Sequence, residues 1–207
     1  MVTNTKRTYN NSIKEMKKVL KEGDKMKKFL KALLILLLIG LSLLLLVIDN
    51  GYSMYKEAID KISVEDKVKE IQSKENYTKI SELPQMYIKA VISVEDHRFY
   101  KHAGIDIIAI GRALVNDIKA MSFVEGGSTI TQQLAKNIYF TQEKSALRKV
   151  AEMFMAHEIE KNYDKDTILE LYLNTSYFGE GYDGIGEATQ GYLNKKPIDM
   201  TRNEASM

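Results

Sequence analysis

The sequence predicts an all-α fold in which one membrane-spanning helix precedes a helical domain. Three observations lead to this prediction. Residues 32–48 form an uninterrupted apolar run, and apolar residues further along the chain recur at helical spacing with no strand pattern of comparable length. The only prolines, Pro84 and Pro197, leave the chain between them free of helix-breaking residues. With 207 residues, 44% of them hydrophobic, the chain is long enough to bury a core.

The apolar run, ALLILLLIGLSLLLLVI, has no charged residue and extends back to Phe29 across the single Lys31. At ~1.5 Å per residue, about twenty such residues cross the ~30 Å hydrocarbon core of a bilayer. A cleavable signal peptide is the alternative, but the preceding segment is long and no small-residue cleavage site follows Ile48. Residues 29–48 are therefore predicted to be a transmembrane helix.

The distribution of charge predicts how the chain is oriented in the membrane and restricts the ligands that it can bind. Residues 1–31 contain ten Lys and Arg against three Asp and Glu, so residues 1–28 are predicted to be a cytoplasmic basic tail. The remainder carries a net charge of −5, which argues against wholesale nucleic-acid binding and requires a local basic cluster for any anionic ligand. The absence of cysteine excludes a disulfide framework, a thiol nucleophile and a thiolate metal site.

The elements after the membrane span are predicted in order. Residues 49–81 are polar and loosely patterned, which indicates a stalk or linker with short helices, and Leu83-Pro84 marks the boundary of the domain. Thr129 with Gln132 and Thr167 with Glu170 fit the spacing of capping boxes. Helices are expected at residues 85–94, 105–121, 129–138, 145–162, 167–174 and 185–193.

Two apparent motifs carry little weight. Residues 179–184, GEGYDG, satisfy G-x-G-x-x-G, but no buried strand precedes them, so a flexible loop is the better interpretation. His97 and His102 are five residues apart and His157 is distant, which does not match the spacing of a helical zinc site. His102 is instead expected to hydrogen-bond within its own loop and close a turn at Gly104.

The stretch EDHRFYKHAGID, residues 95–106, follows an apolar helix. Glu95 and Asp96 are adjacent, and side chains diverge by about 100° per residue on a helix, so both cannot face one cleft. One can serve catalysis and the other structure. A solvated helix end is the alternative for such a pair.

The stretch GGSTITQQLAKN, residues 126–137, opens a helix whose first N–H groups could hold phosphate oxygens. Gln132 and Lys136 share one helical face, and Gln133 and Asn137 share the next. An ordinary capped surface helix would show the same pattern.

Arg148 and Glu152 lie four residues apart on a face that continues into apolar residues, which suggests a partly enclosed cleft. An exposed ion pair, contributing only about 0.3–0.5 kcal/mol, is the alternative.

Four segments in this order behind a membrane anchor, EDHRFYKHAG, GGSTITQQLAKN, RKVAEMFMAHEIE and KDTILELYLN, resemble the peptidoglycan glycosyltransferase (transglycosylase) domain of penicillin-binding proteins, family 51 of the glycosyltransferases. The layout is most similar to the monofunctional members. The resemblance implies an α-helical, lysozyme-like fold with a small membrane-associated jaw, here residues 107–123. It also implies that the enzyme polymerises lipid II into β-1,4-linked glycan strands, with inversion and release of undecaprenyl diphosphate.

The resemblance also implies roles for individual residues. Glu95 matches the catalytic general base, and Glu152 matches a second glutamate that lies near the departing diphosphate or orients the donor. Substrate and diphosphate binding is implied for Ser128, Gln132, Gln133, Lys136, Asn137, Lys144 and Arg148. Shaping of the turn that holds Glu95 is implied for Asp96, Phe99, His102 and Gly104. A divalent cation, Mg²⁺ or Mn²⁺, bound with the substrate diphosphate is implied by the family alone, since the sequence has no metal-ligand motif.

The same resemblance sets expectations for domain, partners and location. The domain is expected at residues 82–207, C-terminally incomplete because relatives continue past NEASM, and Leu193 stands where phenylalanine is usual. Expected partners are lipid II, the growing glycan strand, the membrane and other cell-wall synthesis proteins, without nucleic acid. The protein is expected in the bacterial cell membrane as a single-pass protein with an external catalytic domain. A lysozyme-like hydrolase and an inactive truncated scaffold of the wall-synthesis machinery are the alternatives.

Overall fold

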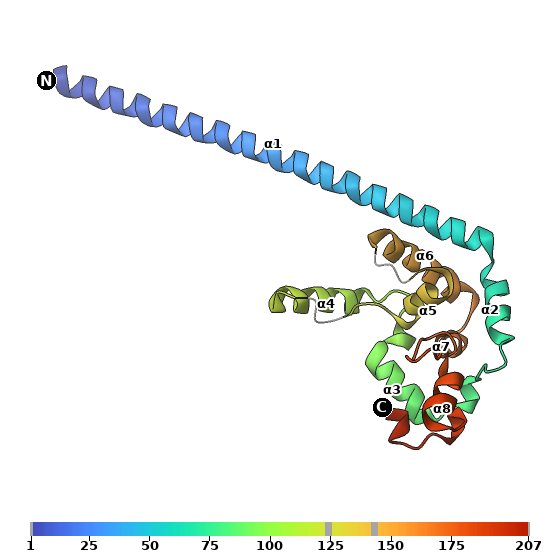
Figure 1. Ribbon diagram of the computed structural model, residues 1–207. Coiled ribbons are helices and arrows are strands. Elements are labelled where there is room, and N and C mark those ends of the chain that lie inside the picture. Colours follow the sequence, from blue (N-terminus) through green and yellow to red (C-terminus); the bar gives the residue numbers. More distant parts are fainter. Residues whose placement is uncertain (1, 123–125, 142–144, 207) are drawn as a thin grey trace. The chain divides into compact units, whose positions relative to one another are not determined.

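The structure, a computed structural model, describes residues 2–122, 126–141 and 145–206. It contains two compact units, Met1–Val47 and Ile48–Met207. Within the described ranges the regular elements are all helical, apart from one isolated bridge between Tyr177 and Asp183 (Figure 1). The predicted all-α class is confirmed.

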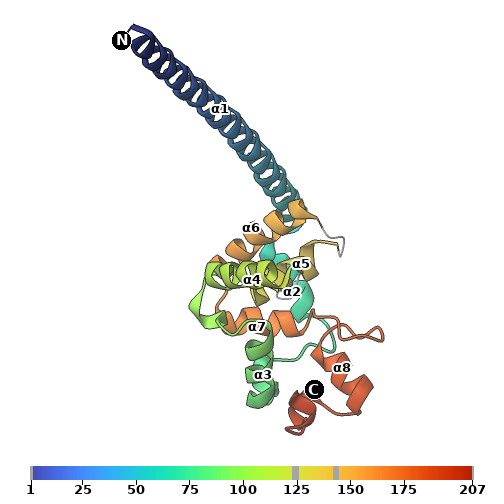
Figure 2. The same ribbon diagram turned by 90° about the vertical axis from the view of Figure 1, so that its left-hand side faces the viewer.

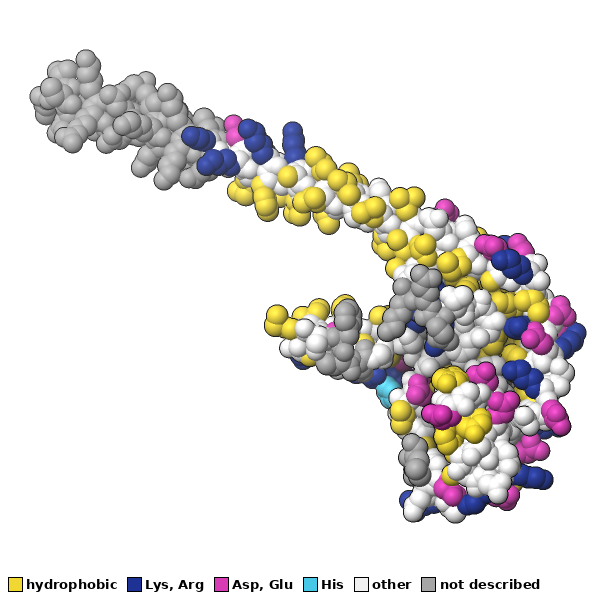
Figure 3. Space-filling model, viewed as in Figure 1, with side chains coloured by type: hydrophobic (Ala, Val, Ile, Leu, Met, Phe, Trp, Pro, Cys, Tyr) yellow, Lys and Arg dark blue, Asp and Glu magenta, His cyan; other side chains and the backbone are white. Residues whose placement is uncertain are grey.

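The first helix, α1 (Val2–Lys61), contains the predicted membrane span. Its part Gly23–Lys61 holds an 18-residue window of mean hydropathy 2.9, none of it buried in the protein. Apolar side chains line this stretch in Figure 3, and Leu36 is 66% exposed. Length and composition therefore fit a single membrane crossing, because exposed leucines are stable against lipid and not against water.

The end of α1 packs onto the globular unit, where the sequence predicts a stalk. Gly51 lies so close to α6 (Ala146–Asn162) that a Cβ there would be 2.5 Å from Val150 Cγ1. The rings of Tyr52 and Tyr55 lie 5.2 Å and 6.0 Å from the ring of Phe154. A glycine and two aromatic residues thus dock this part of the helix on α6.

Helix α2 (Val64–Gln72) also belongs to the globular unit. Ser63 caps it by accepting the N–H of Asp66, and Val64, Val68 and Ile71 are buried. These three positions follow helical spacing, but charged residues surround them in the sequence. The segment is therefore predicted to be a polar linker from its sequence alone. Gly51 and these three residues of α2 therefore pack within the globular unit, inside the range 49–81 that is expected to be a stalk or linker with short helices.

The segment between α2 and α3 is tied to α7 (Lys165–Leu173) by polar side chains. Asn174 Oδ1 accepts the N–H of Thr78, and Asn174 Nδ2 donates to the carbonyl of Thr78, both at 2.8 Å. Glu170 accepts the N–H of Ile80 at 2.6 Å and the hydroxyl of Tyr77. The capping box predicted for Thr167 and Glu170 is therefore wrong.

Asp164 caps α7 in place of Thr167, because its carboxylate accepts the Thr167 N–H at 2.8 Å. The six helices predicted for the domain are otherwise confirmed to within two residues at each end. They are α3 (Gln85–Glu95), α4 (Ile107–Ala120), α5 (Ile130–Tyr139), α6, α7 and α8 (Ile185–Leu193), with short 3-10 helices η1 (Ile80–Glu82), η2 (Phe99–Lys101), η3 (Pro197–Asp199) and η4 (Glu204–Ser206).

Helix α5 lies at the centre of the globular unit and packs against α6 and α7 (Figures 1 and 2). Ile130, Leu134 and Ala135 are completely buried on its inner side. The inner residues fix the rotation of α5 and so decide which side chains its remaining face presents.

Helix α4 differs from α2, α3 and α5 to α8 because most of its apolar side chains are uncovered. It begins at the cap Asp106 and ends at Met121 in the left-handed conformation, and only Ala113 is buried. It extends away from the rest of its unit in Figure 1, and apolar side chains cover it in Figure 3. Its exposed apolar residues are Ile107, Ile108, Leu114, Val115, Ile118 and Met121.

Candidate active site

Glu95 is the last residue of α3 and is exposed. Gln133 of α5 donates its Nε2 hydrogen to Glu95 Oε2 at 2.8 Å. The hydroxyl of Tyr172 on α7 donates to Oε1 of the same Gln133 at 3.3 Å. A carboxylate at this position faces the negative end of its own helix dipole, so a donor from α5 offsets that unfavourable interaction.

Asp96 points inward and anchors the turn that follows α3. It is 7% exposed, its Oδ2 lies 2.9 Å from His102 Nε2, and the same oxygen accepts the Ile130 N–H at 3.1 Å. Phe99, fully buried, lies edge-on to the His102 ring. The expected hydrogen bond of His102 within its own loop is present.

Gly104 lets the turn lie against α6. Its φ is +87°, and a Cβ there would lie 3.1 Å from the carbonyl oxygen of Ala156. The Gly104 carbonyl accepts the hydroxyl of Thr129 at 2.6 Å. A side chain at this position would be strained by both conformation and contact.

The N-terminus of α5 is already occupied by protein groups. Thr129 and Gln132 form the predicted capping box, with each backbone N–H donating to the other's side chain at 3.1 Å. The N–H of Ile130 donates to Asp96. The suggestion that these N–H groups hold phosphate oxygens is therefore wrong for these three donors, because each already has an acceptor.

Glu152 on α6 is buried, 2% exposed, between two cations. Its Oε1 lies 2.7 Å from Arg148 Nε and its Oε2 lies 2.9 Å from Lys149 Nζ. Lys149 Nζ also donates to Ser128 Oγ at 2.6 Å. We call Ser128, Arg148, Lys149 and Glu152 the cation cluster. It carries two positive charges against one negative charge, beside the segment that leads into α5.

The other predicted binding residues lie in different surroundings. Gln132 is 1% exposed, and Lys136 is half-buried, one turn after Gln133 on α5. Asn137 lines a small pocket that includes Lys67 of α2 and Thr175. Lys144 lies outside the described residues. The structure thus brings Glu95 to Gln133, and it joins Ser128 to Glu152 through Lys149. Asn137 lies at a pocket that α2 also lines.

Asp106 and Arg98 form a second buried pair beside the turn. Arg98 Nε lies 2.8 Å from Asp106 Oδ2, and Asp106 Oδ1 accepts the N–H groups of Ile108 and Ala109 at 3.0 Å. Burial opposes ionisation of Asp106, but these donors together hold the pKa of its carboxyl below the usual value. Ligand atoms of Asp96, His102 and Asp106 lie within 4.8 Å of one another, but Asp106 is paired with Arg98. Asp96 already contacts His102 and the Ile130 N–H.

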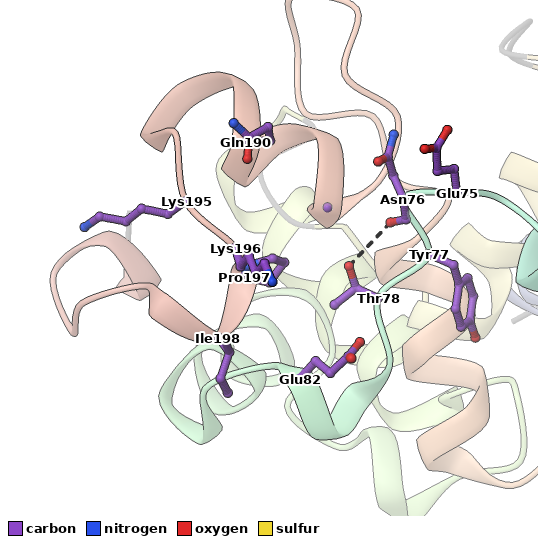
Figure 4. Close-up of a pocket in the computed structure, with 11 residues that line it drawn as sticks. Glu75, Asn76, Tyr77, Thr78, Glu82, Gln190, Lys195, Lys196, Pro197 and Ile198 are labelled. Carbon is purple, nitrogen blue, oxygen red and sulfur yellow. Dashed lines mark hydrogen bonds between the residues drawn. The ribbon is translucent and has the colours of Figure 1, made fainter.

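A pocket of about 470 Å³ lies elsewhere on the unit (Figure 4). Residues 75–78 form one wall, and residues 195–198 form another. Lys195 points away from it in the figure and pairs with Glu204 at 2.8 Å. No candidate catalytic or binding residue is among its lining residues.

Sequence reasoning missed Tyr172 and the contacts of Lys149. Tyr172 lies within the motif KDTILELYLN, where its helical position reads as a core residue. Lys149 is predicted to belong, with Lys136, Lys144 and Arg148, to the local basic cluster, but nothing in the spacing shows that it bridges Glu152 and Ser128. Both contacts join segments distant in the sequence.

The fold and the site together define an all-helical transglycosylase domain with an exposed carboxylate and a cation cluster, both placed against α5. The sequence model of the family described as Transglycosylase matches residues 63–207, and the chain belongs to this family of peptidoglycan transglycosylase domains found in penicillin-binding proteins.

Curated relatives agree with this assignment. Penicillin-binding protein 1F of Bacillus subtilis (strain 168) is 51% identical over 128 residues, which is 62% of this chain and 18% of that protein. Penicillin-binding protein 1A of Neisseria gonorrhoeae is 43% identical over 136 residues, 66% of this chain and 17% of that protein. The protein of the same name from Neisseria lactamica is 44% identical over 136 residues. The chain spans less than a fifth of the length of these relatives.

Proposed function

We propose that this domain polymerises lipid II into β-1,4-linked glycan strands and releases undecaprenyl diphosphate. The observation that carries the proposal is the arrangement around α5: a side chain of this helix holds the exposed Glu95, and the residues leading into it contact the cation cluster. An inverting glycosyl transfer needs a base on the acceptor side and positive charge on the leaving-group side.

Glu95 is the general base. Its carboxylate removes the proton from the acceptor sugar's 4-hydroxyl as that oxygen attacks the donor's anomeric carbon. The new carbon–oxygen bond forms while the bond to the diphosphate oxygen breaks, and the electron pair leaves with undecaprenyl diphosphate. General-base assistance contributes about 10²- to 10⁴-fold to such a step.

The cation cluster and Lys136 neutralise the departing diphosphate. Arg148 and Lys149 keep a net positive charge after pairing with Glu152, and Lys136 has no ion-pair partner within the described ranges. Glu152 holds the two cations in place without facing solvent. These groups are pre-oriented, so little reorganisation is needed as negative charge develops on the leaving oxygen.

A divalent cation bound with the substrate would supply further charge neutralisation at the diphosphate. The described residues of the cluster do not fit a metal held by the protein, because both oxygens of Glu152 already contact cations and the other members are basic or hydroxyl groups. The side-chain cations therefore carry the neutralisation in this account.

Helix α4 is the membrane-associated jaw, and the apolar part of α1 is the anchor. Exposed residues such as Leu114 and Ile118 would lower their free energy in the acyl boundary of a bilayer. The excess of basic residues in 1–31 supports an orientation with the N-terminus in the cytoplasm and the catalytic domain outside. A lipid-linked substrate would then reach Glu95 without leaving the membrane.

Incubation of the full chain in detergent with labelled lipid II, and in parallel with finished peptidoglycan, tests the proposal. Glycan polymer from lipid II, with finished peptidoglycan left intact, is the expected result. Soluble fragments from finished peptidoglycan without polymer from lipid II would instead identify a lysozyme-like hydrolase.

A further inference from the structure

Tyr172, Gln133 and Glu95 form a hydrogen-bonded chain from the core to the surface. Tyr172 is 7% exposed, and its hydroxyl lies 3.3 Å from Gln133 Oε1. Gln133 is half-buried, and its Nε2 lies 2.8 Å from Glu95 Oε2. The three residues come from α7, α5 and α3, so the chain joins three helices.

The chemistry of the amide makes this chain directional. A carboxylate only accepts hydrogen bonds, so an ionised Glu95 requires the NH₂ end of Gln133. The oxygen end of Gln133 then points to Tyr172, where a hydroxyl can donate to it. Without that hydroxyl, either end of the amide could face inward, and the donor to Glu95 would no longer be fixed.

We infer that Tyr172 is a positioning residue for the general base, acting through Gln133 to hold the Glu95 carboxylate in one orientation. The inference rests on the proposed function of Glu95. It assigns to Gln133 a task on the acceptor side, where the family resemblance implies substrate and diphosphate binding.

The surroundings of Tyr172 keep its hydroxyl protonated. Burial and the charge of Glu95 raise the pKa of Tyr172 to about 12. Tyr87 of α3 also faces it, and burial raises the pKa of Tyr87 as well. The Tyr172 hydroxyl therefore stays a donor at every pH at which Glu95 could act as a base.

Fixing one oxygen of Glu95 leaves the other available for the reaction. Within the described part of the chain, Glu95 Oε1 accepts no hydrogen bond, so it can take the proton from the acceptor hydroxyl. A general base is effective only when its lone pair points at that proton. Loss of the hydrogen-bonded chain from Tyr172 to Glu95 is expected to lower kcat and to leave the KM for lipid II unchanged.

Steady-state kinetics of the full chain with lipid II test this inference. Tyr172→Phe keeps the ring and removes the hydroxyl, and it should lower kcat about tenfold, as expected for one hydrogen bond. Gln133→Leu removes the bond to a charged group and should lower kcat about 10- to 100-fold. Tyr192→Phe is the control, because its hydroxyl bonds the carbonyl of Phe178, and it should match the wild type.

The double variant Gln133→Leu/Tyr172→Phe tests whether Tyr172 acts through the hydrogen-bonded chain or whether the two substitutions have independent structural effects. If Tyr172 acts only through Gln133, the double variant is no slower than Gln133→Leu alone. Multiplied effects of the two substitutions, a raised KM with normal kcat, or wild-type kinetics of Tyr172→Phe would each overturn the inference.

A second measurement is independent of turnover. The chain has six glutamines, so ¹⁵N labelling of glutamine gives few side-chain amide signals, and Gln133→Leu identifies the pair from Gln133. We expect Tyr172→Phe to shift these signals and Tyr192→Phe to leave them in place. Unshifted signals in Tyr172→Phe would contradict the inference. The expected shift in Tyr172→Phe, together with a wild-type chain that makes no polymer from lipid II, would contradict only the proposed function.

Discussion

At the scale of residues, Glu95 and Asp96 are neighbours with opposite surroundings because α3 ends between them. Asp96 has φ −159° and ψ 74°, which turns its carboxylate inward to His102 and the N–H of Ile130. Glu95, still helical, stays exposed beside Gln133. The turn thus ties the orientation of α3 to the start of α5 through the buried Asp96.

Asp106 should give the stability of the domain a specific dependence on pH. Its carboxyl has a folded-state pKa below the ordinary value of 3.8, so its contribution is fully present above about pH 4 and is lost as the pH falls through the folded value. Asp106→Asn removes the pairing with Arg98 and should lower the free energy of unfolding by about 1–2 kcal/mol at neutral pH. Thermal midpoints of the full chain in detergent between pH 7 and pH 2.5 measure this effect.

The difference between wild type and Asp106→Asn should shrink below pH 4, since the wild-type carboxyl then loses its charge. Asp199→Asn, at an exposed position, serves as the control and should follow the wild type throughout. A gap that stays constant down to pH 2.5 would show that the ion pair does not supply the stabilisation.

Residue types and spacing predicted part of the site and not its connections. Adjacency on a helix predicted that Glu95 and Asp96 cannot face the same side, and one is exposed while the other is buried. The hydrogen bond of His102 within its own loop was also anticipated. The contact between Lys149 and Ser128 and that between Tyr172 and Gln133 were not, because periodicity gives the face of a helix and not the partner that covers it.

At the scale of elements, apolar periodicity predicted the helices of the domain well, and it failed where charge masks the pattern. Helix α2 buries three apolar residues among many charged ones, and the end of α1 docks through Gly51 and aromatic rings. Neither is a continuous apolar stripe. The N-cap of α7 was also predicted wrongly, since Asp164 and not Thr167 caps this helix.

The chain has no tryptophan, so a single tryptophan introduced on the apolar surface of α4 would report its own surroundings. Ile118→Trp, in the full chain reconstituted into vesicles, should emit at short wavelength and be quenched by brominated lipids, because this position is 66% exposed on an apolar face. Lys161→Trp, exposed on α6, should emit as in water. Equal emission and equal quenching of the two variants would rule out membrane insertion of α4.

At the scale of the whole molecule, the basic tail and the domain should lie on opposite sides of the membrane. The chain has no cysteine, so single substitutions report their own location. In intact cells an impermeant maleimide should label Lys161→Cys and not Lys21→Cys, since the basic tail is retained in the cytoplasm. Labelling of Lys21→Cys before lysis would reverse the proposed orientation.

The central claim is that Glu95 accepts a proton while the cation cluster receives the diphosphate. The most direct measurement is polymerisation of lipid II by wild-type chain and by Glu95→Gln, which keeps the size of the side chain and cannot act as a base. We expect the variant to lose at least about 10²-fold in rate while its thermal midpoint stays near that of the wild type. Polymer formation by Glu95→Gln at the wild-type rate would contradict the account.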